Sequence, residues 1–196
     1  MVQTPIKSMI QTRLTLEAFL QQPETKPAQE FIDGHVYTKP MPQGEHSITQ
    51  GEFVTTINSA IKPNKIALAL PELRCTFGGR SIVPDVAVFR WDRLPKTESG
   101  RIGNKFTIAP DWTLEILSPG QSNTIVLEKI LHCLDHGTEM GWMLDLEEET
   151  LFVSVPDGRM RSVKRIDEAL PLPGFMKTLD PAFTITLGDV LSWLQV

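Results

Sequence analysis

The chain has 196 residues, which suits one domain, and 41% of them are apolar, enough for a buried core. Its formal net charge of -5 argues against a surface that coats nucleic acid indiscriminately, because nucleic-acid-binding domains are often strongly basic. A local basic groove remains compatible with that balance. No apolar run approaches the roughly 18 residues of a membrane span, and the N-terminal residues lack the apolar segment of a signal peptide. We therefore expect a cytoplasmic protein that does not enter a membrane.

The first third of the chain predicts a helix, a hairpin and a second helix. Residues 15–22 form a short amphipathic pattern. Asp33-Gly34 lies between two apolar pairs and predicts a hairpin over 29–40. Apolar residues at helical spacing predict a helix over 46–61.

The middle of the chain predicts strands around one long loop. Residues 65–76 read as a strand interrupted by Pro71, and the Gly78-Gly79 turn joins it in a hairpin to a strand over 82–90. The polar residues 92–110 form the loop. Each of the two cysteines, Cys75 and Cys133, stands in an apolar segment, so we expect buried free thiols in a reducing compartment.

The remaining elements alternate between strands and helices. Residues 123–136 carry the clearest helical pattern, with a polar cap before it and Gly137 after it. The other expected elements are a strand at 112–118, strands at 139–146, 150–155 and 159–165, a proline-rich loop at 166–178 and a helix at 189–195.

This order implies a mixed sheet with helices on both sides, around one core. The fold class is therefore α/β, in the sense of an α+β arrangement on a mixed sheet. We expect a single domain over 1–196, with its core at about 15–155 and a C-terminal extension over 156–196.

Two mostly apolar strand-like segments each contain one acidic residue, Asp85 in the first and Glu115 in the second. Strands that are apolar on both faces belong in the middle of a covered sheet, and a buried carboxylate is costly unless something pairs with it or coordinates it. Two such carboxylates at neighbouring strand ends suggest a site for Mg²⁺, which prefers oxygen ligands. A divalent cation there suits phosphodiester hydrolysis, because it neutralises the phosphate and activates water.

Pro84-Asp85, followed thirty residues later by Glu115-Ile116-Leu117, resembles the PD-(D/E)xK nuclease superfamily. A longer ordered set of residues is similar to one branch of it, the Uma family of restriction-endonuclease-like proteins, which is abundant in cyanobacteria. The matching pieces are Glu30 to Gly34, His46, Val83 to Val88, Glu115 to Pro119, Lys129, and Gly141 to Asp145.

The resemblance implies a restriction-endonuclease-like core, in which a central four-stranded mixed sheet is flanked by α-helices. It implies Asp85 and Glu115 as ligands of Mg²⁺ or Mn²⁺, with the backbone carbonyl of Ile116 as a further ligand. It also implies Glu30 as an additional acidic residue of the catalytic site.

The lysine of the usual superfamily motif falls on Leu117, which has no ionisable group. The resemblance implies that this lysine has moved to the following helix, where it is Lys129 and orients the attacking water. At about 100° per residue, Lys129 lies at the edge of the apolar stripe that centres near Val126 and Ile130. This edge position is neither fully solvated nor deep in the core, and it allows the side chain to reach a strand end.

Structural roles compete with these assignments. Asp85 can bond to nearby backbone N–H groups, Glu115 can pair with Arg74 or Arg90, and Lys129 can extend its ammonium into solvent. Further alternatives are a surface position for Glu30, a structural or a site-neighbour role for His46, a solvent-facing histidine pair at His132 and His136, and a structural role for Ser118.

The resulting hypothesis is a metal-dependent endonuclease that acts on nucleic acid, in the first place DNA. Many nucleases of this superfamily are dimers, because cutting both strands needs two sites, and we expect Trp193, Leu194 and Val196 to offer exposed apolar groups for a homodimer contact. The alternative is a catalytically silent nucleic-acid-binding or assembly protein on the same fold. Hydrolysis of another phosphoester is a third reading.

Overall fold

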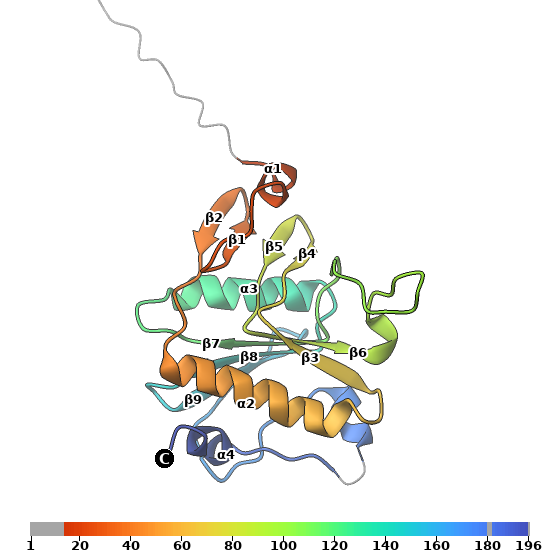
Figure 1. Ribbon diagram of the computed structural model, residues 1–196. Coiled ribbons are helices and arrows are strands. Elements are labelled where there is room, and N and C mark those ends of the chain that lie inside the picture. The colour runs from red at the N-terminus through yellow and green to blue at the C-terminus, as the bar shows by residue number, and fades with distance from the viewer. Residues whose placement is uncertain (1–13, 180–181, 196) are drawn as a thin grey trace, which may run out of the picture.

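The computed structural model describes residues 14–179 and 182–195, which form two sheets and the helices around them (Figure 1). The larger sheet has six strands in the order β10-β9-β8-β7-β6-β3. All neighbours in it are antiparallel except β7 and β8, which are parallel. Its strands are β3 (Ala67–Pro71), β6 (Val86–Arg90), β7 (Trp112–Ile116), β8 (Met140–Asp145), β9 (Thr150–Ser154) and β10 (Met160–Val163).

The smaller sheet is antiparallel, with four strands in the order β2-β1-β5-β4. Its strands are β1 (Gln29–Ile32), β2 (His35–Thr38), β4 (Cys75–Phe77) and β5 (Arg80–Ile82). The helices are α1 (Leu16–Leu20), α2 (Gly44–Ile61), α3 (Asn123–Asp135) and α4 (Leu187–Ser192), with 3-10 turns at Trp91–Arg93 and Gly174–Thr178.

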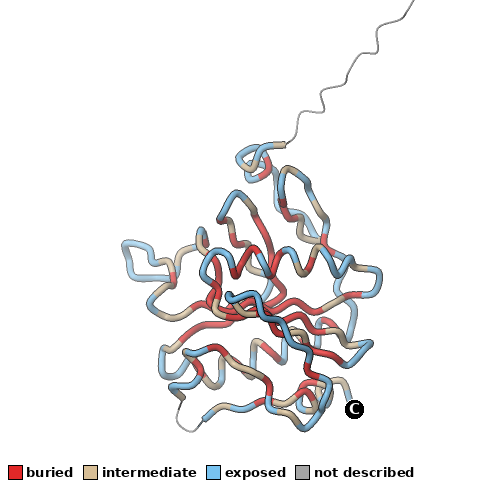
Figure 2. The backbone as a smooth tube through the Cα atoms, turned by 180° about the vertical axis from the view of Figure 1, so that it is seen from behind, coloured by how far each residue is buried: buried red, intermediate tan, exposed pale blue. Residues whose placement is uncertain are grey.

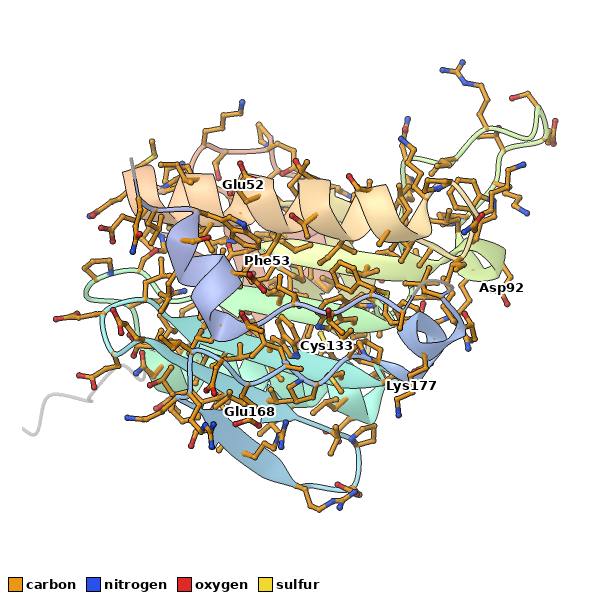
Figure 3. All side chains as sticks on the ribbon, turned by 90° about the horizontal axis from the view of Figure 1, so that it is seen from below. Glu52, Phe53, Asp92, Cys133, Glu168 and Lys177 are labelled. Atoms are coloured by element: carbon orange, nitrogen blue, oxygen red, sulfur yellow. The ribbon has the colours of Figure 1, made fainter. Side chains whose placement is uncertain are left out.

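The two long helices lie on opposite faces of the larger sheet (Figure 1). Side chains alternate along each strand, so successive residues of one strand face different helices. On β7, Leu114 and Ile116 share a core with Phe53 of α2, while Glu115 points to the side where α3 lies and meets Lys129. Phe53 points from α2 toward the sheet, and Glu52 lies on the exposed side of the same helix (Figure 3). Buried residues follow the larger sheet through the middle of the molecule (Figure 2).

Helix α3 connects β7 to β8, as a parallel pair requires. It packs closely on β8, where a Cβ at Gly141 would overlap Cγ2 of Ile130. The edge strand β3 has its free side bonded by α2, because the amide of Asn58 both donates to and accepts from the backbone of Ala69, at 2.9 Å each way.

Two expected strands are each divided in the structure. The segment 65–76 forms β3 and β4. In the segment 82–90, Ile82 is the last residue of β5 and Val86 is the first residue of β6. The glycine turn therefore joins β4 to β5, while β3 pairs with β6. Pro84 has no N–H to donate to a ladder. Asp85 consequently lies in a bend just before β6 and not inside a strand.

The residues after 155 contribute to the core of the larger sheet. Val163, Leu170, Leu187 and Val190 are buried in it. Trp193 is partly buried and packs edge-on against Phe53, with ring centroids 4.9 Å apart, so the expectation of an exposed tryptophan is wrong. Val196 lies outside the described residues.

Both cysteines are buried and free, as expected. Burial raises the pKa of the Cys75 thiol to about 12, and it also raises the pKa of Cys133. Within the described ranges, no helix combines the length and the apolar character that crossing a membrane requires.

Candidate metal centre

The two acidic residues singled out in the sequence lie at the same end of the larger sheet. Val86 of β6 stands opposite Leu114 of β7 in their antiparallel register. Continuing that register by one residue sets Asp85 opposite Glu115. Both side chains are buried, at 2% and 1% exposure for the whole residues. The sheet itself therefore brings the two carboxylates together at one buried place.

Asp85 has partners on both carboxylate oxygens. Its Oδ1 lies 2.6 Å from Nζ of Lys39. Its Oδ2 accepts a 2.7 Å hydrogen bond from the backbone N–H of Ile116 and lies 3.2 Å from Nε2 of His46. Burial opposes ionisation, but the charge of Lys39 and the hydrogen bond from His46 outweigh it, so the pKa of Asp85 is lowered.

Glu115 shares a buried lysine with Glu30. Nζ of Lys129 lies 2.9 Å from Oε1 of Glu115 and 2.9 Å from Oε1 of Glu30. Burial raises the pKa of Glu115 to about 7, although Lys129 opposes that change. Burial also disfavours the charged form of Lys129, yet the neighbouring carboxylates prevail and raise its pKa.

Val83 links the two halves of this network through its backbone. Its N–H donates to Oε1 of Glu30 at 2.7 Å, and its carbonyl accepts from Nζ of Lys39 at 2.9 Å. The segment before β6 thus holds one acidic residue and one lysine in fixed positions. We name the whole set the acidic cluster: Glu30, Lys39, His46, Asp85, Glu115 and Lys129.

The structure brings together all four side chains that the sequence and the resemblance single out: Glu30, Asp85, Glu115 and Lys129. Lys129 is only 1% exposed, so the expected position at the edge of the helix stripe is wrong. Glu30 is buried as well, at 3%, which rules out a surface position for it.

The arginine partners considered for Glu115 are engaged elsewhere. Arg74 pairs with Glu24 at 2.7 Å, and Nε of Arg90 lies 3.1 Å from Asp111. His46 lies in the first turn of α2 and contacts Asp85, which makes it a neighbour of the site.

The histidine pair on α3 is not solvent-facing as a whole. His132 is buried, its Nε2 lies 3.2 Å from the carbonyl oxygen of Phe77, and burial lowers its pKa. Only His136 is exposed. The expectation of two solvated rings is therefore wrong for His132, which the smaller sheet covers.

Lys39 is the one member of the acidic cluster that sequence reasoning missed. It follows β2 in a short run of prolines and polar residues, Thr38-Lys39-Pro40-Met41-Pro42, which reads as an ordinary loop. Its contact with Asp85 spans 46 residues of sequence. No local pattern carries that information.

Two clefts flank the loop between β7 and α3. One, of about 270 Å³, is lined by Glu30, Lys39 and the loop residues Pro119 to Ser122. The other, of about 640 Å³, is lined by His46, Asp145 and the same loop. Asp85, Glu115 and Lys129 line neither of these two clefts, so Lys39 and His46 stand between solvent and Asp85.

The oxygen atoms of the acidic cluster fit a hard divalent cation in their chemistry. Among the described residues, Oε2 of Glu115 is buried without a hydrogen-bond partner, which leaves it free to act as a ligand. The described part of the chain contains no group of three or more His, Cys, Asp or Glu side chains arranged to hold a metal. A metal site here therefore needs Asp85 and Glu115 together with backbone oxygen and water.

Residues 16–185 match the family Uma2, whose description is "Putative restriction endonuclease". The chain belongs to the Uma2 family. The resemblance inferred from the ordered motifs is thereby confirmed. No curated protein matches the chain.

A solved structure is similar to this Uma2 protein over nearly its whole length. It is described as the crystal structure of a putative nuclease belonging to DUF820 from Anabaena variabilis ATCC 29413. The two sequences are 51% identical, the match covers 92% of this chain and 99% of that chain, and the TM-score is 0.88. The expected restriction-endonuclease-like α/β fold is confirmed, and the larger sheet has six strands, two more than the implied four-stranded core.

Proposed function

We propose that this Uma2 protein is a divalent-metal-dependent endonuclease that hydrolyses phosphodiester bonds in nucleic acid, in the first place DNA. One observation carries the proposal. Asp85 and Glu115 are buried opposite each other at the end of β6 and β7, and within the described residues Oε2 of Glu115 lacks a partner. A buried carboxylate oxygen without a partner is costly. A bound cation removes that cost.

In this proposal, Asp85, Glu115 and the backbone carbonyl of Ile116 hold Mg²⁺ or Mn²⁺. The ion supplies charge neutralisation at the phosphate and lowers the pKa of a bound water. Lys129 is positioned by Glu30 and Glu115, at 2.9 Å from each. An ammonium has three N–H donors, and among the described residues Nζ of Lys129 makes these ion-pair contacts without a well-aligned hydrogen bond, so at least one donor is available to the attacking water.

The test is cleavage of duplex DNA, single-stranded DNA and RNA with Mg²⁺ or Mn²⁺, alongside a panel of nucleotides and simple phosphoesters. We expect cleavage of at least one nucleic acid by the wild type, and a loss of about 100-fold or more in Asp85→Asn and Glu115→Gln, on the scale of removing a main electrostatic group. Matched controls are Asp135→Asn and Glu128→Gln, which remove exposed carboxylates of α3. A wild type that is inert on every nucleic acid with Mn²⁺ refutes the proposal.

One observation favours a second candidate, a nucleic-acid-binding or assembly protein without turnover. Both oxygens of Asp85 already have partners, in Lys39, His46 and the N–H of Ile116. Calorimetric titration with Mg²⁺ and Mn²⁺ separates the two candidates. Binding that disappears in Asp85→Asn favours the nuclease, and absence of binding favours the silent protein.

We also propose that the protein forms a homodimer, because cutting both strands of a duplex needs two sites. We propose the cytoplasm as its location. Trp193 packs against Phe53 within the same chain, which leaves little of it for a partner copy. Light scattering over a range of concentrations tests the dimer, and a constant monomer mass contradicts it.

A further inference from the structure

Lys39 holds Asp85 in the manner of a metal ion. Its ammonium lies 2.6 Å from Oδ1 of Asp85 and donates a 2.9 Å hydrogen bond to the carbonyl oxygen of Val83. One carboxylate and one backbone carbonyl are the oxygen ligands that Mg²⁺ and Ca²⁺ take in proteins. The Lys39 side chain is 7% exposed, so this contact is made almost wholly out of water.

Formal charge distinguishes the lysine from a divalent ion. Glu30, Asp85 and Glu115 carry three negative charges when ionised, and Lys129 returns one positive charge. Without Lys39 the remaining charge is minus two. A single ammonium compensates half of it, whereas a divalent cation compensates all of it.

We propose that Lys39 is a tethered competitor of the divalent metal: it occupies Oδ1 of Asp85 in the metal-free protein and is displaced when the ion binds. The inference rests on the proposed metal site and adds a residue to it. Lys39 is a positioning residue in the metal-free state, because its contact with Oδ1 holds the Asp85 carboxylate in place before the ion arrives.

The structure provides a place for the displaced side chain. Lys39 lines the cleft of about 270 Å³ together with Thr38, Pro40 and the loop residues Pro119 to Ser122. The ammonium can turn into this cleft while the backbone N–H of Lys39 stays bonded to the carbonyl of Ala28 at 2.9 Å. There it is available to an anionic oxygen of the substrate, whereas Lys129 stays enclosed by its two carboxylates.

Lys39→Met tests the competition, because methionine fills similar space without charge. We expect Mn²⁺ to bind this variant at least about tenfold more tightly than the wild type. This is the factor that follows if Oδ1 of Asp85 is free of Lys39 in about one-tenth of the wild-type molecules. Without metal, the melting temperature of Lys39→Met should be below that of the wild type. Mn²⁺ should raise the melting temperature of the variant by more than it raises that of the wild type. The matched control is Lys62→Met, at an exposed lysine, with Mn²⁺ affinity unchanged.

A second measurement uses the wild type alone and does not depend on the variant folding. An amine-reactive label followed by mass spectrometry reports the accessibility of each lysine. Adding saturating Mg²⁺ should increase labelling at Lys39 several-fold, with Lys62 labelled equally in both conditions and Lys129 protected in both.

The outcomes separate this inference from the proposed function. If the wild type binds Mn²⁺ while Lys39→Met binds it no more tightly and labelling of Lys39 does not change, the metal site stands and the competition is refuted. If neither protein binds Mn²⁺ or Mg²⁺, both the competition and the metal-dependent nuclease are refuted.

Discussion

Lys129 on α3 and Glu115 on β7 face each other with Nζ and Oε1 2.9 Å apart, and both side chains are almost wholly removed from solvent, at 1% and 2% exposure. Glu30 lies at the same distance from the same ammonium. A buried ion pair stabilises a protein only when its partners remain matched. The acidic cluster is therefore a place where single changes have large effects.

Replacing the central lysine should destabilise the fold. Lys129→Met leaves Glu30 and Glu115 buried without their cation, so we expect the free energy of unfolding to fall by about 3–5 kcal/mol. Urea denaturation measures it. The double variant Lys129→Met with Glu115→Gln should recover part of the loss, because it also removes one of the unmatched charges. Equal loss in the single and double variants would contradict the pairing.

Metal affinity should depend on pH through Glu115. Burial raises the pKa of this carboxyl to about 7, so below that pH a proton occupies it and competes with the ion. We expect the affinity for Mn²⁺ to rise between pH 6 and 8, by up to about tenfold per pH unit on the acidic side. Calorimetry in matched buffers measures it. An affinity that is flat across this range would show that Glu115 is not a ligand.

The free energy of unfolding should also depend on pH through Asp85 and Glu115, in opposite directions. The pKa of Glu115 is higher in the folded chain than its ordinary value of 4.5, so its contribution to stability is complete below about pH 4.5 and is lost as the pH rises through about 7. The pKa of Asp85 is lowered, so its contribution is present above its ordinary value of 3.8 and is lost on further acidification. Glu115→Gln should therefore flatten the stability profile between pH 4.5 and 7, while Asp85→Asn should flatten it below pH 4, as measured by urea denaturation.

The close contact of α3 with β8 predicts the effect of a single methyl group. Gly141→Ala puts a Cβ into Cγ2 of Ile130, one residue along α3 from Lys129. We expect a loss of about 1–3 kcal/mol from overpacking, measured by urea denaturation, together with weaker Mn²⁺ binding as α3 shifts. Gly51→Ala is the matched control, because space around Gly51 in α2 is open. It should stabilise the chain by about 0.5–1 kcal/mol.

Replacing Asp111 should lower the stability of the fold without changing its affinity for metal. Asp111 is buried at the opposite end of β7 from the acidic cluster, where it accepts 2.8 Å and 2.6 Å hydrogen bonds from the backbone of Arg90 and the guanidinium of Arg93. Asp111→Ala leaves these donors unmatched, so a loss of about 3 kcal/mol or more is expected. Its affinity for Mn²⁺, measured below the unfolding transition, should equal that of the wild type. A parallel loss of affinity would mean that the metal readout reports general damage.

The local parts of this fold are readable from sequence because short-range signals determine them. Asp33-Gly34 makes the β1–β2 turn, with the backbone φ of Asp33 and Gly34 at 51° and 85°. Thr15 caps α1, and its side chain accepts from the N–H of Ala18. The interruption at Pro71 is readable from sequence, but the break at Pro84 and the assignment of the separated strands to two different sheets are not, because they depend on long-range pairing.

The same distinction applies to the acidic cluster. Asp85 and Glu115 stand out because a carboxylate inside an apolar strand segment is unusual in any context. The burial of Lys129 could not be read from helix geometry, since it depends on the smaller sheet, whose Glu30 contacts the ammonium of Lys129. Lys39 carries no local signal at all, because its partner Asp85 becomes a neighbour only after the β1–β2 hairpin pairs with β5.

A crystal of the wild-type protein soaked in Mn²⁺ would show whether Asp85 and Glu115 together bind a divalent cation. Anomalous scattering identifies manganese independently of the protein atoms. We expect one peak at about 2–2.3 Å from a carboxylate oxygen of each residue, near the distances of hard divalent cations, and no such peak in Asp85→Asn. A wild-type crystal without a peak at this place, or with one that persists in Asp85→Asn, would contradict this expectation.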